Sequence, residues 1–172
     1  MMRTRMLALA VISATMLATP AFAQFDWKGL LSGAEKSVHF NASLPMGDLS
    51  KATDFGGGIG VAGVYPWKAN IDGVIQLDVL YWTGDFNAIV VDWQGLARYN
   101  IGSADSGMRP FVEAGIGLGR QAMFGSGAAA TGAMDLGFTL GGGVKLGKLG
   151  VLAQYQTLGN WSWITAGVSM HF

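Results

Sequence analysis

The stretch WSWITAGVSMHF, residues 161–172, decides the fold class because its side chains alternate between two kinds. Every second residue from Ile164 to Phe172 is apolar, and the residues between them are small or polar. A period of two residues is typical of a β-strand with one apolar and one polar face. Its length suits a tilted strand that crosses a bilayer, which needs ~9–11 residues. The segment therefore predicts a membrane-crossing strand at the end of the chain.

Seven earlier segments show the same alternation and are separated by turn residues. They are residues 37–44, 55–65, 71–82, 88–101, 109–120, 133–145 and 150–158. Across these segments most charged and amide side chains fall on one parity and most large apolar ones on the other. Eight consecutive antiparallel strands predict an all-β, up-and-down transmembrane β-barrel over residues 37–172, the smallest of the outer-membrane series.

Two glycine-alternating strands carry a family resemblance. FGGGIGVAGVY (55–65) and RPFVEAGIGLGR (109–120) resemble strands of the small outer-membrane β-barrel or opacity-protein-like porin family. In that family the terminal aromatic and the apolar residues before it, here Phe172, Met170 and Val168, serve as an assembly signal. The resemblance implies insertion into outer-membrane lipid by the barrel-assembly machinery. The short loops expected between the strands differ from the long loops of adhesin-like members.

The N-terminus reads as a secretory signal peptide over residues 1–23. Arg3 and Arg5 are followed by an apolar run and by the small-x-small site Ala21-Phe22-Ala23, which predicts export and cleavage before Gln24. The apolar run is too short for a membrane-spanning helix. Residues 24–36 form either a short amphipathic helix or a mobile leader, and the sequence leaves both open. We expect the mature protein in the outer membrane.

Composition excludes several functional classes. The 172 residues have a formal net charge of zero, so no basic surplus indicates nucleic acid. The absence of cysteine excludes disulfide bonds and thiolate metal sites. The length suits one domain, and we expect a monomer with no cofactor.

Aromatic residues gather near both ends of the predicted strands. If both termini lie in the periplasm, Tyr65, Trp67 and Tyr99 fall at the periplasmic ends. The predicted outer group comprises Tyr81, Trp82, Trp161 and Trp163. Paired aromatic girdles are typical of membrane barrels.

A water-soluble barrel is the main structural alternative. Lipocalin-like barrels also have eight alternating strands, but their apolar face points inward around a ligand. Alternation alone does not say which face is inside. The girdles, the terminal Phe172 and the charges on one parity favour the membrane barrel.

The predicted lumen contains five charged residues that we treat as the candidate site. Hairpin pairing sets Asp78 opposite Asp92 and places Arg98 diagonal to Glu113, with Arg109 nearby. An eight-stranded barrel is just wide enough for side chains to fill, and unpaired buried charges are costly. We interpret the group as a structural plug of ion pairs and amides, with a polar conduit for small solutes as the alternative.

The two histidines are the remaining candidates for chemistry. His39 and His171 share the lumen parity on the first and last strands, where metal binding is possible but closure of the barrel is the simpler explanation. Neither is expected at the outer rim beside a serine and a carboxylate, the arrangement that a lipid-modifying enzyme needs. The sequence therefore favours a non-enzymatic barrel with a structural or envelope-integrity role. A narrow channel is the alternative, and a lipid-modifying enzyme comes third.

Overall fold

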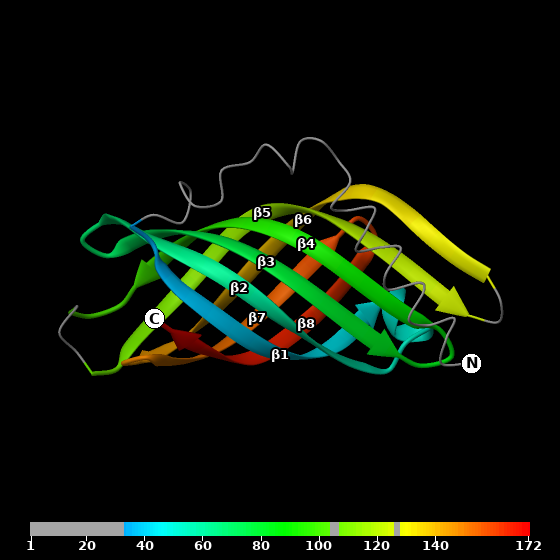
Figure 1. Ribbon diagram of the computed structural model, residues 1–172, viewed down its shortest axis with the longest axis horizontal. Helices are drawn as coiled ribbons and strands as arrows, with labels where there is room; N and C mark the ends of the chain where they lie inside the picture. Colours follow the sequence, from blue (N-terminus) through cyan, green and yellow to red (C-terminus); the bar gives the residue numbers. More distant parts are fainter. Residues whose placement is uncertain (1–32, 104–106, 126–127) are drawn as a thin grey trace. The chain divides into compact units, whose positions relative to one another are not determined.

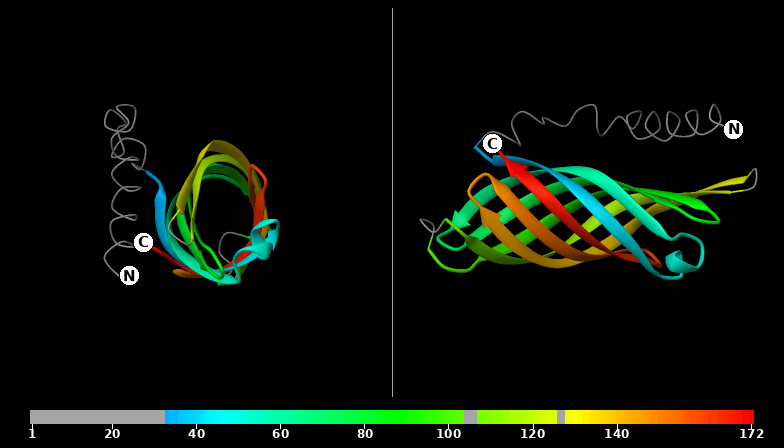
Figure 2. Two further views of the ribbon diagram at one scale, coloured as in Figure 1. Left: turned by 90° about the vertical axis from the view of Figure 1, so that its right-hand side faces the viewer. Right: turned by 90° about the horizontal axis from the view of Figure 1, so that it is seen from below.

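The computed structural model describes residues 33–172 apart from 104–106 and 126–127, and it contains eight antiparallel strands joined in one closed barrel. Each strand pairs with its neighbour in sequence, and β8 pairs with β1 to close the ring (Figures 1 and 2). The strands are β1 Glu35–Gly47, β2 Phe55–Lys68, β3 Ile71–Thr83, β4 Asn87–Asn100, β5 Arg109–Gly125, β6 Ala128–Leu146, β7 Leu149–Leu158 and β8 Trp161–His171. The predicted eight-stranded up-and-down barrel is confirmed.

The ring closes where the two ends of the barrel sequence meet. Lys36 and Phe172 exchange backbone hydrogen bonds of 3.2 and 2.9 Å, and eleven residues of β1, from Ser37 to Gly47, are paired with β8. Where the eight strands form the closed ring, no sheet edge is left unpaired, which is the condition for strands to lie in lipid. We call the end of the barrel that carries Lys36 and Phe172 the terminal end, and the opposite end the loop end.

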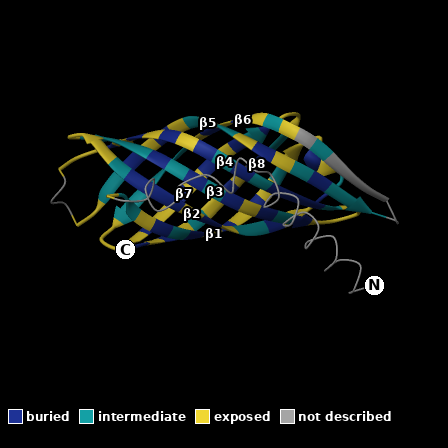
Figure 3. Ribbon diagram, turned by 45° about the horizontal axis from the view of Figure 1, so that its top comes forward, coloured by how far each residue is buried: buried dark blue, intermediate teal, exposed yellow. Residues whose placement is uncertain are grey.

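The apolar faces of the strands point outward. Large apolar side chains such as Phe40, Ile116, Leu136 and Val168 are about half exposed or more, whereas the alternate polar side chains are buried (Figure 3). This arrangement is the reverse of a lipocalin-like barrel, whose apolar residues surround a ligand. The apolar-out interpretation of the sequence is confirmed.

Several element boundaries differ from the sequence-based expectation. β1 begins at Glu35, two residues earlier than predicted. The segment 121–131, expected to be a loop, is mostly strand, because β5 continues to Gly125 and β6 starts at Ala128. β7 pairs with β6 only as far as Gly137, so the β5–β6 hairpin extends beyond it (Figure 2). A register shift between Arg120 and Ala122 interrupts the alternation there, which is why the period-two pattern missed the extension.

The expected signal peptide (1–23) and residues 24–32 of the expected leader lie outside the described residues. Among the residues that are described, no helix is long and apolar enough to cross a membrane.

A short 3-10 helix, η1, occupies Leu49–Lys51 in the connection between β1 and β2. Thr53 closes the turn, because its backbone N–H and its Oγ1 both donate to the carbonyl of Leu49, at 3.0 and 2.9 Å. Gly47 precedes the turn with a φ of +58°, a left-handed conformation that other residues rarely adopt. This geometry directs the side chain of Leu49 into the barrel, where it is fully buried.

Candidate functional site

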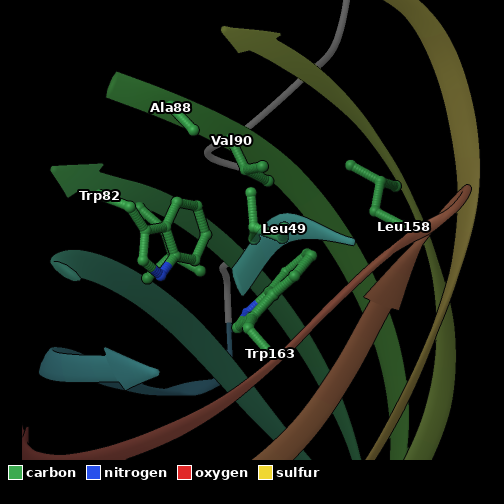
Figure 4. Close-up of a cluster of buried hydrophobic side chains, with 7 residues drawn as sticks. Leu49, Trp82, Ala88, Val90, Leu158 and Trp163 are labelled. Carbon is green, nitrogen blue, oxygen red and sulfur yellow. The ribbon is translucent and has the colours of Figure 1, made fainter. Parts of the chain in front are cut away.

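An apolar group of side chains fills the loop end of the lumen, and we call it the loop-end cluster. It consists of Leu49, Leu80, Trp82, Ala88, Val90, Leu158 and Trp163 (Figure 4). The two indole rings pack edge to face, with centroids 5.5 Å apart and an interplanar angle of 65°. Each indole N–H also has an acceptor: Trp82 donates to Ser43 Oγ at 3.1 Å and Trp163 to Gln156 Oε1 at 2.5 Å. The cluster thus joins the η1 turn to four strands.

This cluster corrects the predicted outer girdle. Trp82 and Trp163 are wholly buried inside the barrel, so their assignment to a lipid-facing girdle is wrong. Trp161 is partly buried and packs against the same cluster, whereas Tyr81 lies on the outward parity of β3. The reason is parity: Trp82 follows Gln76 and Asp78 at even spacing and therefore shares their face. At the terminal end, Trp67 and Tyr99 are exposed, and Tyr65 is half-buried on the outward parity of β2.

A polar network fills the middle of the lumen, and we call it the central network. Asp78 lies at its centre and is directly opposite Asp92, as the sequence predicts. Asp78 Oδ1 lies 2.6 Å from His39 Nε2 and accepts from Asn41 at 3.3 Å, and its Oδ2 accepts from Gln76 at 2.5 Å. Asp78 therefore has a hydrogen-bond partner on each carboxylate oxygen.

Asp92 has fewer hydrogen-bond donors around it than Asp78, the carboxylate that it faces. Its Oδ2 accepts from Gln94, and Gln94 in turn accepts from Thr139 at 2.7 Å. Its Oδ1 is buried and has no hydrogen-bond partner among the described residues. Two facing carboxylates with one orphan oxygen are an unfavourable arrangement, because like charges directly opposite each other on a sheet repel.

An ion pair anchors the central network on the terminal side. Arg98 donates from Nε and Nη2 to Glu113 Oε2, at 2.9 and 2.8 Å. The two residues are directly opposite on β4 and β5, which corrects the diagonal arrangement expected from the sequence. Gln154 donates to Glu113 Oε1 at 2.8 Å and accepts from Gln156 at 2.8 Å. The network therefore runs from Arg98 to the indole of Trp163. Its amide side chains are not among the site residues that the sequence predicts.

The terminal end of the lumen holds a cavity of about 240 Å³, which we call the terminal-end pocket. Its lining includes three cationic side chains, Arg98, Arg109 and Lys145, and two carboxylates, Glu35 and Asp72. Arg109, predicted to lie near Arg98 and Glu113, lies at this rim, and its Nη2 donates to the carbonyl of Ala69 at 3.5 Å.

Barrel closure brings a serine, a histidine and a carboxylate together at the same end. Ser169 Oγ lies 3.0 Å from His171 Nε2, and His171 Nδ1 lies 2.7 Å from Glu35 Oε1. The Nδ1 contact is within ion-pair distance. Glu35 is also paired with Lys145. The spacing Ser169-x-His171 was the available sequence signal, but Glu35 becomes its neighbour only through pairing of β1 with β8.

The histidines occupy separate positions along the lumen. His39 contacts Asp78 in the central network, and His171 lies at the terminal end beside Ser169 and Glu35. Within the residues that the structure describes, no three His, Cys, Asp or Glu side chains are grouped so as to hold a metal ion.

The fold is that of the small eight-stranded outer-membrane β-barrels. No protein-family model and no curated protein sequence matches the chain. Among solved structures, Neisserial surface protein A (NspA) matches with a TM-score of 0.61 and 14% identity, over 81% of this chain and 97% of NspA.

Two further solved structures share the fold, and one of them is named as an enzyme whereas the other is not. The attachment invasion locus protein Ail of Yersinia pestis matches with a TM-score of 0.53 and 12% identity, over 81% of this chain and 97% of Ail. The outer membrane enzyme PagL matches with a TM-score of 0.54 and 15% identity, over 79% of this chain and 98% of PagL. The shared fold therefore accommodates both enzymatic and other members.

Proposed function

We propose that this protein is an integral outer-membrane barrel with a structural, envelope-integrity role and a lumen closed to solutes. The observation that carries the proposal is the loop-end cluster, in which Leu49, Trp82 and Trp163 fill the lumen with apolar side chains. Water and ions avoid an apolar constriction. The central network adds a second layer, in which Asp78 accepts a hydrogen bond from Gln76 on its own strand and Glu113 accepts one from Gln154 of β7.

The outward surface supports membrane residence. Apolar side chains on all sides of the ring, among them Ile59, Leu118 and Leu140, are about half exposed. A soluble monomer rarely exposes contiguous apolar surface on this scale, whereas hydrocarbon solvates it. We propose outer-membrane lipid as the surroundings of the barrel and the barrel-assembly machinery as its partner in biogenesis. Val168, Met170 and Phe172 point outward and are available to such a receptor.

A narrow channel is the second candidate, because the terminal-end pocket opens part of the lumen to solvent-sized molecules. Planar-bilayer recordings separate the two functions. We expect no discrete openings from the wild-type protein. Discrete openings whose size changes when Asp78 and Arg98 are neutralised would overturn the closed lumen and favour the channel.

An enzymatic role is tested on the cell envelope. Lipid A from a deletion strain and from its complemented parent is compared by mass spectrometry. The structural role predicts identical lipid A profiles and a greater sensitivity of the deletion strain to detergent. An altered acylation pattern that returns to normal on complementation would contradict it.

A further inference from the structure

The terminal-end pocket brings together cationic side chains from three neighbouring strands. Arg109 and Lys145 are cross-strand partners on β5 and β6, and Arg98 lies on β4. Like charges directly opposite each other on a sheet destabilise it unless a counter-charge is present. The facing cations Arg109 and Lys145 therefore need negative charge nearby.

Two of the three cations, Arg98 and Lys145, have a carboxylate partner within the protein. Arg98 is paired with Glu113, and its guanidinium also lies over the ring of Phe111, 4.1 Å from the centroid. Lys145 is paired with Glu35. The second lining carboxylate, Asp72, accepts from Asn100 at 2.7 Å and lies opposite Arg98 on the neighbouring strand. Among the described residues, none of these carboxylates forms an ion pair with Arg109.

Arg109 is the third cation, and it differs from the other two in its partners. Across the described part of the chain, no carboxylate forms an ion pair with it. Among the described residues its one hydrogen bond, to the carbonyl of Ala69, is long at 3.5 Å. The side chain lines the pocket, and the guanidinium fork favours an oxyanion that accepts two parallel hydrogen bonds.

The size and walls of the pocket indicate the kind of anion. A volume of about 240 Å³ is several times the ~30 Å³ that a water molecule occupies in the liquid, so the pocket holds more than a bare ion. Val64 and Phe111 provide apolar wall beside the cations. We propose that the terminal-end pocket binds a small organic phosphate, with its phosphate group on Arg109 and its organic part against Phe111.

Isothermal titration of the full chain, folded in a neutral detergent at low ionic strength, tests this proposal. Glycerol 3-phosphate is the probe, and glycerol and sodium chloride are the matched controls. We expect one saturable site for glycerol 3-phosphate and no saturable heat from either control. Arg109→Gln should weaken binding at least about tenfold, because the fork donates charge-assisted hydrogen bonds.

Two further variants separate binding from folding. Arg120→Gln removes an exposed arginine elsewhere on β5 and should bind as the wild type does. Arg109→Lys keeps the charge but loses the fork, and it should bind with intermediate affinity. Each variant is first checked for heat-modifiable migration in gels, the mark of a folded barrel. Wild-type protein without a saturable site, or folded Arg109→Gln that binds as tightly as wild type, would overturn the proposal.

The same titration in nanodiscs identifies the source of the phosphate. Addition of phosphatidylglycerol to a zwitterionic bilayer weakens glycerol 3-phosphate binding if lipid headgroups reach Arg109. An unchanged affinity assigns the pocket to soluble phosphates, which is the result we expect because the lining side chains face the lumen. Weakened and unchanged affinity both require that the pocket binds phosphate, and they differ in whether a lipid headgroup or a soluble phosphate occupies it.

Discussion

Asp78 and Asp92 face each other across β3 and β4, and both side chains are buried inside the barrel. Their surroundings are unequal. Asp78 has partners on both oxygens, from His39, Asn41 and Gln76, whereas Oδ1 of Asp92 has none. Hydrogen bonds therefore stabilise the carboxylate of Asp78 more than that of Asp92.

This inequality predicts opposite effects of two matched substitutions. Asp92→Asn removes the repulsion and should raise the free energy of unfolding by up to about 1 kcal/mol. Asp78→Asn leaves buried donors without a charged acceptor and should lower it by about 1–3 kcal/mol. Urea titration in lipid vesicles at mildly alkaline pH measures both. Equal effects of the two substitutions would show that the pair is symmetric.

Gly60 is expected to tolerate no side chain. A Cβ atom there would collide with the carboxylate of Asp78 and with the imidazole of His39. Gly60→Ala should lower the free energy of unfolding by about 1–3 kcal/mol, because the contact between His39 and Asp78 must separate. Gly95→Ala on β4, where a Cβ meets nothing within 4 Å, is the control and should be nearly neutral. A comparable loss in the control would attribute the effect to strand glycines in general.

Leu49 is expected to contribute more to stability than its place in a connecting turn suggests. The side chain is fully buried against Trp82, Val90 and Leu158. Leu49→Ala should lower the free energy of unfolding by about 2–5 kcal/mol, the range for large-to-small changes in a packed core. Lys51→Ala, in the same turn, removes only an exposed ion pair with Asp48 and should unfold as the wild type does. A small effect at Leu49 would mean that the turn moves freely away from the lumen.

Tryptophan quenching tests which indoles face lipid. Trp163 is enclosed by the loop-end cluster, whereas Trp67 is exposed at the terminal end. With lipids brominated near the headgroup, Trp67→Phe should reduce the quenched share of the emission. Trp163→Phe should reduce only the unquenched share. Loss of quenched emission in Trp163→Phe would show that Trp163 faces lipid, as the sequence predicts, and would contradict its burial in the lumen.

Ser169 is expected to be unreactive in spite of its contact with His171. Glu35 Oε1 is shared between Lys145 and His171 Nδ1. The ion pair with Lys145 weakens Glu35 as the carboxylate that would support His171 as a general base. A fluorophosphonate probe should therefore leave the folded barrel unlabelled. Labelling that disappears in Ser169→Ala and persists in Ser162→Ala would contradict this and assign a nucleophile.

Much of the fold follows from local pattern. The alternation in residues 161–172 and in the seven earlier segments places each side chain on one of two faces, and the burial of the strands agrees with it. Short turns made the pairing of Asp78 with Asp92 predictable, because a tight hairpin determines its own register. The extension of β5 past Arg120 was not predictable, because the register shift there breaks the period of two.

The candidate site was only partly predictable. Asp78, Asp92, Arg98 and Glu113 were identified from their parity, and Trp82 could have been placed inside by the same rule. Leu49 carries no such signal, because it lies in a turn without a period. The contact of His171 with Glu35 joins the last strand to the first, and these two strands are far apart in the chain.

The sequence by itself determined that eight strands form and which side chains of each share a face, because strand geometry repeats every two residues wherever it occurs. Only the tertiary structure decided which of those side chains meet. Closing the ring set the stagger of β8 against β1, and that stagger assigns each inward residue a depth and a set of neighbours from distant strands. The loop-end cluster, the central network and the terminal-end pocket therefore arise from closure of the barrel and from no single segment.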